Sequence, residues 1–300
     1  MNSRVKAIVQ ALFVVFLWAT SWVFIKIGLQ EIPPLTFAGL RYVIAFVCLL
    51  IVLFFNKAKS EISSLTIQKW WKFILLGFLF YAATQGASFV ALYYLPAVTV
   101  NLIWSFSSVA VALLGILWLA EKPTRFQWIG IILALFGALV YFYPVTIPQA
   151  QYIGLIVAFV GVGANALSSV LGRSINRLKE HHPLVVTVIS MGAGSILLLG
   201  VGLYTEGIPV IDIKGWGIIL WLAIVNTAFA FTLWNHTLRT LSAVESSIIN
   251  STMLIWIPLF AVAFMGETVT PKAIIGLVIV GIGSLIVQIR RLSAIKSKSS

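Results

Sequence analysis

Long runs of apolar residues alternate with short polar connections along most of this 300-residue chain. A helix needs about 20 predominantly apolar residues to cross the hydrocarbon core of a bilayer. By that measure the pattern predicts ten transmembrane helices, at residues 7–29, 35–55, 70–94, 97–119, 126–143, 153–175, 184–204, 216–238, 243–265 and 272–289. The connections carry helix breakers such as Pro96 and Pro123, and none is long enough to form a separate soluble domain.

The apolar pattern repeats after 146 residues. Four residues of the first half recur with unchanged type at this shift, namely Glu121 as Glu267, Thr124 as Thr270, Gly130 as Gly276, and Gly137 as Gly283. We therefore predict an internal duplication, with residues 1–146 as the first half and residues 147–300, which include a basic tail, as the second. The seven-residue spacing of the glycines predicts that the last helix of each half packs closely against a neighbour.

The number of predicted helices in each half is odd, so the second half enters the membrane upside down. The predicted fold is an all-α integral membrane protein of ten transmembrane helices, arranged as two inverted five-helix repeats. Inverted repeats are typical of secondary transporters, because the same hinge can open toward either side of the membrane.

Composition supports a bilayer as the solvent of this chain. The sequence is 61% hydrophobic and 9% charged, whereas a soluble domain carries about 25% charged residues. Its net charge of +12 could indicate a nucleic-acid partner, but the basic residues lie in short segments between apolar runs. If both termini are cytoplasmic, 16 of the 20 Lys and Arg residues lie on the cytoplasmic side, as the positive-inside rule requires. We therefore predict a multi-pass protein of the cell (inner) membrane with cytoplasmic termini and no nucleic-acid partner.

Several sequence features together resemble a known family. They are the duplication, the ten spans, Trp18-Ala19-Thr20-Ser21 in the first span, and a Glu-x-x-Thr motif before a helix with two glycines seven residues apart. Over residues 7–289 the chain is similar to the drug/metabolite transporter superfamily, and within it to the EamA-type permeases. This resemblance implies a permease for small metabolites, often an exporter of amino acids or related compounds, with a central cavity between the repeats.

Polar side chains inside a span are costly unless they face the bundle or a wet cavity. We predict a substrate-binding cavity with aromatic walls and a few neutral hydrogen-bonding groups, which is the usual character of a small-molecule site. Its predicted lining residues are Trp18, Trp22, Tyr81, Gln85, Asn101, Trp104, Ser105, Asn165, Asn226, Trp234, Asn250 and Ser251. The alternative for each Ser and Thr is a structural hydrogen bond within the helix bundle. No catalytic residue, cofactor or metal site is predicted.

Charged and titratable residues near the spans carry further expectations. We expect Lys26 to extend toward the membrane interface and Arg41 to face protein, a cavity or Glu31. His236 is expected to be neutral and hydrogen-bonded, with proton transfer as the alternative, and the adjacent His181 and His182 are expected to be solvated. No carboxylate lies at mid-membrane, so the sequence gives little support to Na⁺ coupling or an acidic proton relay.

Two glutamates at helix ends and one proline inside a helix carry structural expectations. Glu121 and Glu267 are expected to cap the helix that follows each of them or to bond the adjacent loop. Pro258 is expected to interrupt and kink the ninth helix. Because Ala112 holds the matching position in the fourth helix, this kink would make the two mouths of the transporter unequal.

The predicted function is secondary transport of small metabolites by alternating access, with export as the expected direction. An intramembrane enzyme is disfavoured, because the sequence has neither His-Glu-x-x-His nor Gly-x-Ser-x-Gly. A channel is disfavoured by the lack of repeated like charges. A carrier for nucleotide sugars or lipid-linked substrates stays open, although phosphate would call for more basic residues at mid-depth than Lys26 and Arg41. The expected partners are a small-molecule substrate and membrane lipids, for a monomer or a homodimer.

Overall fold

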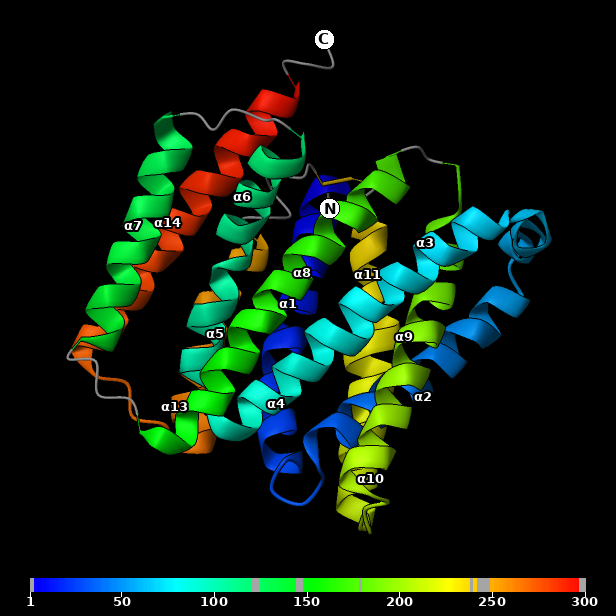
Figure 1. Cartoon of the computed structure of the whole chain (residues 1–300), viewed down its shortest axis with the longest axis horizontal. Coiled ribbons are helices and arrows are strands. Elements are labelled where there is room, and N and C mark those ends of the chain that lie inside the picture. The colour runs from blue at the N-terminus through cyan, green and yellow to red at the C-terminus, as the bar shows by residue number, and fades with distance from the viewer. Residues whose placement is uncertain are drawn as a thin grey trace. The chain divides into compact units, whose positions relative to one another are not determined.

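The computed structural model contains helices and no strands in the part of the chain that it describes, which is residues 3–119, 125–143, 148–177, 180–237, 240–241 and 249–296 (Figure 1). Its longer α-helices are α1 (Ser3–Gly28), α2 (Pro34–Phe54), α3 (Ile67–Gly77), α4 (Gly86–Tyr94), α5 (Ala97–Ser105), α6 (Ser107–Leu119), α7 (Arg125–Phe142), α8 (Tyr152–Arg177), α9 (Pro183–Glu206), α10 (Ile213–Ala223), α11 (Ala230–Thr237), α13 (Met253–Met265) and α14 (Pro271–Lys296). Shorter segments are the 3₁₀ helices η1 (Lys57–Ser64) and η3 (Gln149–Gln151) and the π-helical segments η2 (Phe78–Gln85) and η4 (Ile224–Phe229).

Seven helical stretches of the described residues are long and apolar enough to cross a membrane, at Arg4–Gly28, Pro34–Phe54, Ile67–Tyr94, Arg125–Phe142, Gln149–Gly172, Pro183–Glu206 and Ile213–Trp234. Shorter apolar helices cover Ala97–Val111, Ile249–Met265 and Pro271–Val287, each overlapping one of the three remaining predicted spans. Large apolar side chains such as Leu139 and Val160 are exposed, as expected where lipid replaces water. The chain is therefore an all-α, multi-pass membrane protein.

Helix boundaries recur at the same 146-residue shift as the sequence pattern. Adding 146 to the bounds of α3 and α6 gives the bounds of α10 and α13, and η2 and η4 begin at matching positions. The two halves of the sequence therefore form similar backbone segments, down to the place where a regular α-helix gives way to a π-helical turn.

The fourth and ninth predicted spans are both interrupted, also at matching positions. Phe106 N–H donates to the Ile103 carbonyl oxygen at 3.1 Å, and Thr252 N–H donates to the Ile249 carbonyl oxygen at 3.1 Å. Each is a tight turn with a three-residue repeat. Helix α13 then continues through Pro258 without a break. The prediction that Pro258 interrupts the ninth helix is wrong, since the interruption lies before the proline and also occurs in the fourth span, which lacks one.

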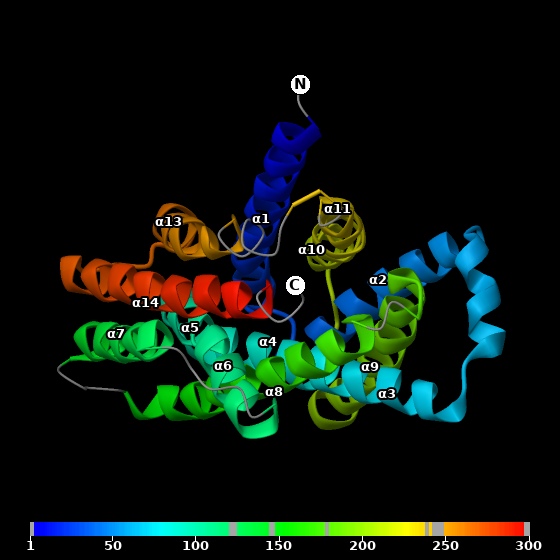
Figure 2. The same cartoon turned by 90° about the horizontal axis from the view of Figure 1, so that it is seen from above.

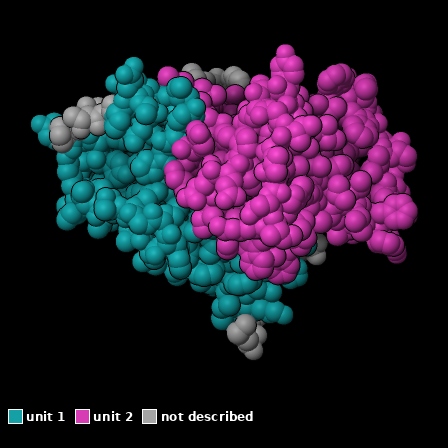
Figure 3. Space-filling model, turned by 90° about the horizontal axis from the view of Figure 1, so that it is seen from below, with its two compact units in different colours: residues 1–23, 94–155, 230–300 teal, residues 24–93, 156–229 magenta. Residues whose placement is uncertain are grey.

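The described chain divides into two compact units (Figure 3). Unit 1 comprises residues 1–23, 94–155 and 230–300, and unit 2 comprises residues 24–93 and 156–229. Each unit draws helices from both halves of the sequence, because the closest helix pairs join one half to the other. The units are therefore not the sequence halves.

In unit 1, α7 and α14 lie side by side, as both Figure 1 and Figure 2 show. A methyl group added to Gly130 would lie 2.7 Å from the Gly283 carbonyl oxygen, and one added to Gly137 would lie 2.9 Å from that of Gly276. The two backbones approach at both contacts because no side chain separates them. This confirms the close packing that the glycine spacing predicts.

In unit 2, α2 packs along α9, and α3 and α10 pack against this pair. A methyl group added to Gly39 would lie 2.5 Å from the Leu199 Cα, and one added to Gly202 would lie 2.6 Å from the Thr36 nitrogen. Close backbone contact therefore also holds the central helix pair of unit 2.

We predict that Gly137→Ala destabilises the protein, because the new methyl group has no room between α7 and α14. Overpacking of this kind costs about 1–3 kcal/mol. The matched control is Gly200→Ala, at a helical position with no atom within 4 Å of the added carbon. There alanine gains about 1 kcal/mol of helix propensity. Thermal unfolding in detergent should give a lower melting temperature for Gly137→Ala than for wild type, and equal melting of the two variants would contradict this packing.

Candidate functional site

In unit 2 a carboxylate at the end of α9 holds the start of α2. Glu206 accepts hydrogen bonds from the backbone N–H groups of Leu35 at 3.0 Å and Thr36 at 2.8 Å, and from the Thr36 hydroxyl at 2.9 Å. Helix α2 begins after Pro33 and has no side-chain cap of its own. Its first N–H groups need acceptors, and a carboxylate also suits the positive end of the helix dipole.

The same arrangement occurs with the two helices exchanged. Glu61, in the η1 segment that follows α2, accepts a hydrogen bond from the His182 backbone N–H at 2.8 Å, at the start of α9. Position 182 lies 146 residues after Thr36, and Glu206 lies 145 residues after Glu61. The start of each helix of this pair is therefore bonded by a carboxylate from the last residue of the other helix or from the segment after it.

Unit 1 contains a third carboxylate of this kind. Glu267 accepts from the backbone N–H groups of Ala97 at 2.6 Å and Val98 at 3.2 Å, at the start of α5. Gly266, in the left-handed region with φ 66°, ends α13 and turns the chain toward this contact. The expectation that Glu267 caps the following helix or bonds the adjacent loop is wrong.

Glu267 bonds α5 rather than α14 because the start of α14 has a side-chain cap of its own and the start of α5 has none. The first turn of α14 is already served by Thr270, whose hydroxyl accepts from Ala273 N–H at 3.2 Å. Helix α5 begins after Pro96, which has no side-chain acceptor. Glu267 therefore binds the start that lacks a cap. Glu121, the matching residue of the first half, lies outside the described residues.

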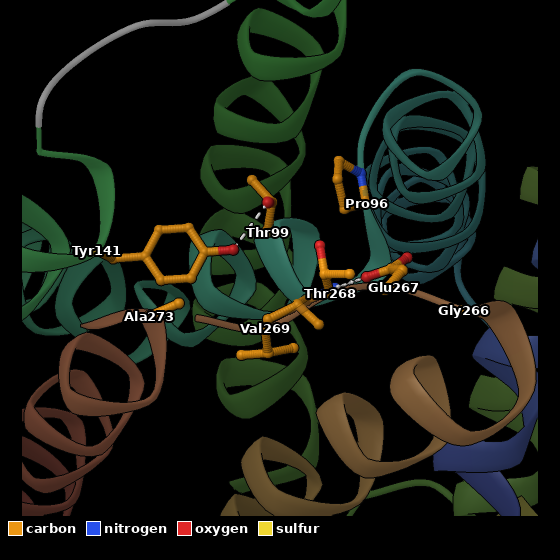
Figure 4. Close-up of a pocket in the computed structure, with 9 residues that line it drawn as sticks. Pro96, Thr99, Tyr141, Gly266, Glu267, Thr268, Val269 and Ala273 are labelled. Carbon is orange, nitrogen blue, oxygen red and sulfur yellow. Dashed lines mark hydrogen bonds between the residues drawn. The ribbon is translucent and has the colours of Figure 1, made fainter. Parts of the chain in front are cut away.

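A pocket of about 330 Å³ lies beside Glu267 in unit 1 (Figure 4). The Thr99 and Tyr141 hydroxyls form a hydrogen bond of 3.0 Å on its wall, where the Tyr141 ring points toward Thr99. Its other lining residues are Pro96, Val98, Gly266, Thr268, Val269 and Ala273. The polar side chains of its lining are the Glu267 carboxylate, which is bonded to the start of α5, and the hydroxyls of Thr99, Tyr141 and Thr268.

The structure places Lys26 and the paired histidines in defined contacts. Lys26, near the end of α1, donates from its Nζ to the Leu92 carbonyl oxygen near the end of α4 at 2.5 Å. His181 is only 11% exposed and packs edge-on against the Phe73 ring, and His182 Nδ1 accepts from Leu184 N–H at 3.2 Å. The prediction that both histidines are solvated is therefore wrong for His181, whereas His182 is half-buried as the N-cap of α9. His236, on α11, is exposed.

The loop before α9 also carries an exposed ion pair. Lys69 Nζ lies 3.0 Å from a carboxylate oxygen of Glu180, and this hydrogen bond holds the pKa of the Glu180 carboxyl below its ordinary value. Because Glu180 is exposed and Lys69 is only half-buried, water screens the pair and it adds little to stability.

The predicted substrate-binding residues are divided between the two units. Unit 1 holds Trp18, Trp22, Asn101, Trp104, Ser105, Trp234, Asn250 and Ser251, and unit 2 holds Tyr81, Gln85, Asn165 and Asn226. In unit 1 the Trp18 ring lies 5.2 Å from the Trp234 ring and 5.3 Å from the Phe231 ring. The structure therefore brings two predicted site residues, Trp18 and Trp234, into contact. Asn250 is exposed, and the Ser105 hydroxyl donates within its own helix to Leu102.

Three buried polar groups of unit 1 have no hydrogen-bond partner among the described residues. They are the indole nitrogen of Trp18, the side-chain nitrogen of Asn101 and the hydroxyl of Ser107. An unpaired buried polar group costs about 1–3 kcal/mol, so each calls for an explanation such as a ligand. Sequence reasoning selected Trp18 and Asn101. It missed Ser107, which follows the Phe106 turn, because nothing in the sequence marks that turn.

The predicted residues of unit 2 lie mainly on π-helical turns. Tyr81 and Gln85 belong to η2, and Asn226 belongs to η4. A threonine on each segment bonds a carbonyl five residues back, Thr84 to Leu79 at 2.7 Å and Thr227 to Leu222 at 2.8 Å. Such turns occur frequently at functional sites because they interrupt the regular hydrogen-bond ladder.

Arg41 lies near η4 and is buried, with 5% of its surface exposed. Its Nε donates to the Thr227 hydroxyl at 3.0 Å. The guanidinium carbon lies 5.2 Å from the centre of the Tyr42 ring and 5.9 Å from that of Phe89. The Tyr42 ring in turn meets the Tyr81 ring at 5.6 Å.

Arg41 forms no ion pair with a carboxylate, Glu31 included, in the part of the chain that the structure describes. The predicted site did not include Arg41, Tyr42, Phe89 or Thr227. The available signal was Arg41 itself, a charge inside a span, but its neighbours come from distant segments.

Comparison with known proteins identifies the chain. The model of the EamA-like transporter family matches residues 5–143 and again residues 152–289. The chain belongs to this family. It is therefore a membrane transport protein of the drug/metabolite transporter type, as its sequence motifs predict.

Relatives of this EamA-like transporter carry transporter names. The uncharacterized transporter YoaV of Bacillus subtilis is 27% identical over 93% of this chain and 95% of its own length. A probable amino-acid metabolite efflux pump of Salmonella typhimurium is 27% identical over 91% of both chains, and one of Escherichia coli is 27% identical over 77% of both. A solved crystal structure of 17% sequence identity aligns over 97% of this chain and 99% of its own, with a TM-score of 0.66, and supports the fold alone.

In this EamA-like transporter, we predict that Glu206→Ala destabilises the protein by about 0.5–2 kcal/mol, the usual cost of losing a helix N-cap. The substitution removes every acceptor that Glu206 offers to the start of α2. Glu31→Ala is the matched control, because Glu31 is an exposed carboxylate a few residues before α2. Melting temperatures in detergent should fall for Glu206→Ala and stay near wild type for Glu31→Ala. A Glu206→Ala protein as stable as this control would show that the cap is dispensable.

Proposed function

We propose that this protein is a secondary transporter that exports small metabolites, amino acids or related compounds, across the cell (inner) membrane by alternating access. Two relatives named as probable amino-acid metabolite efflux pumps support this substrate class and direction. The single observation that carries a binding role for this chain's own residues is the set of unpaired, buried polar groups at Trp18 and Asn101.

The proposed architecture is ten transmembrane helices in two inverted repeats, residues 1–146 and 147–300, with both termini in the cytoplasm. The contacts between α7 and α14 support it. At the 146-residue shift, Gly130 corresponds to Gly276, and Gly137 corresponds to Gly283. In the structure each glycine contacts the counterpart of the other one: Gly130 contacts Gly283, and Gly137 contacts Gly276. Two equivalent helices that exchange contacts in this way are related by a two-fold axis, and their contacts run antiparallel. An axis that makes membrane-spanning helices antiparallel lies in the membrane plane, as inverted repeats require.

Alternating access follows from such a repeat pair. If two halves of similar structure insert in opposite directions, each conformation open to one side has a counterpart open to the other, and the substrate stays near the axis. The proposed binding groups are mostly neutral donors and aromatic rings, which suit a small polar molecule with an apolar part. The proposed site comprises the twelve residues predicted from sequence, and Ser107 joins them because its hydroxyl is unpaired.

The alternative substrate class, nucleotide sugars or lipid-linked compounds, is less well supported. A phosphate group is usually held by several Lys or Arg side chains. Of the two basic residues inside the spans, Lys26 is bonded to a backbone carbonyl, which leaves Arg41. One guanidinium is sufficient for a single carboxylate but insufficient for a diphosphate.

Counterflow in proteoliposomes tests the proposal directly. Vesicles containing purified protein and a high internal concentration of one unlabelled compound are given the same compound, radiolabelled, outside. We expect transient accumulation of label for at least one amino acid and none for nucleotide sugars, with protein-free vesicles as the control. Accumulation of nucleotide sugars alone would favour the alternative class, and accumulation of neither class would reject the proposed function.

Asn101→Leu provides a test at a single residue. Leucine has the same branched skeleton of four side-chain heavy atoms as asparagine but leaves no buried amide without a partner, so the melting temperature should stay equal or rise. Transport should fall at least about tenfold if the amide binds substrate, since that corresponds to one hydrogen bond of about 1.4 kcal/mol. The control is Ser190→Ala, whose hydroxyl bonds its own helix at Val186. Retained transport in Asn101→Leu would remove this residue from the site.

A further inference from the structure

We propose that Arg41 is the anion-binding group of the transporter and that it receives the carboxylate of an organic acid such as an amino acid. This proposal rests on the proposed transport function but names a ligand group and a residue that the predicted site lacks. Four observations of unit 2 support it: the burial of the charge, its unused donors, its aromatic surroundings and the contrast with Lys26.

The first observation is the electrostatic cost of the buried charge. Arg41 is 5% exposed within a helix that crosses the membrane, and guanidinium stays protonated in proteins. An isolated buried charge costs several kcal/mol unless an opposite charge or hydrogen bonds compensate for it. No carboxylate of the described residues lies within 4.0 Å of Arg41. A bound anion would supply the missing countercharge.

The second observation is the geometry of the donors. Arginine has five N–H groups, and Arg41 uses the one on Nε to bond the Thr227 hydroxyl. The Thr227 hydroxyl donates in turn to the Leu222 carbonyl, so η4 fixes the orientation of the guanidinium. The terminal nitrogens form no hydrogen bond with the residues that the structure describes. Their N–H groups form a planar fork that matches the two oxygens of a carboxylate.

The third observation is the set of rings around this fork. Tyr42 and Phe89 flank the guanidinium, and Tyr81 packs against Tyr42. All three rings are buried. Aromatic faces contact a cation favourably and also provide an apolar wall for the rest of a ligand. The chemistry therefore fits a small carboxylate attached to an apolar group.

The fourth observation is that the neighbouring basic residue is engaged differently. Lys26 Nζ bonds the Leu92 carbonyl oxygen, a contact that fixes this ammonium to the end of α4. Lys26 is therefore a structural contact and serves as a control for the general effect of removing a positive charge from unit 2.

The binding test uses purified full-length protein in detergent and simple probes. We expect phenylacetate and isovalerate to raise the melting temperature of the wild-type protein, whereas phenylacetamide and isovaleramide, of the same shape but without charge, do not. This comparison requires no variant. Equal stabilisation by acid and amide, or no stabilisation by either acid, would overturn the proposal.

Variants then assign the effect to Arg41. We expect Arg41→Gln to weaken carboxylate binding about 10- to 100-fold, the range for a hydrogen bond to a charged group. Arg41→Lys should restore part of that loss, because it keeps the charge but not the fork. Lys26→Met should bind carboxylates as wild type does. If Arg41→Gln folds and still binds phenylacetate like wild type, Arg41 is not the anion-binding group.

Counterflow measurements distinguish a failure of carboxylate binding at Arg41 from a failure of the proposed amino-acid transport. A wild-type protein that binds carboxylates through Arg41 but moves no amino acid would leave the anion site standing and reject amino-acid transport. A protein that moves an amino acid and its amide equally well would support transport and reject the assignment of Arg41.

Discussion

The start of a helix inside or near a membrane needs acceptors for its first backbone N–H groups, and the hydrocarbon offers none. In this protein α2 and α5 begin after prolines, which provide no side-chain acceptor. Glutamates from distant segments provide them instead. Glu206 binds the start of α2, and Glu267 binds the start of α5. These contacts join the first half of the sequence to the second and determine where the helices of each unit begin.

Local features of the sequence were sufficient to predict most of the fold. The length of the apolar runs located the seven long apolar helices of the described residues, because a bilayer imposes a minimum length on every crossing. The glycines at a seven-residue spacing predicted the contact between α7 and α14, since only residues without side chains allow such an approach. In each case the sequence of a single helix contains the information: the length of its apolar run or the spacing of its glycines.

Contacts through space could not be predicted in the same way. Glu267 is separated from Ala97 by 170 residues, and the sequence near it contains a closer helix start that Thr270 already caps. Lys26 bonds a carbonyl near the end of α4, on a segment 66 residues away that the sequence around Lys26 does not indicate. The same limitation affected the site: Trp18 and Asn101 were found because polar groups in a span are rare, whereas the surroundings of Arg41 come from α2, α4 and η4. Interpreting a charge requires its neighbours, and these follow from tertiary packing.

The exchanged capping of α2 and α9 has a consequence for movement. The two helices contact each other without intervening side chains at Gly39 and Gly202, and the bonds of Glu206 and Glu61 lie at opposite ends of the pair. Sliding either helix along the other would stretch both end bonds at once. These contacts resist sliding within the pair, so the proposed transport cycle would move α2 and α9 together rather than past each other.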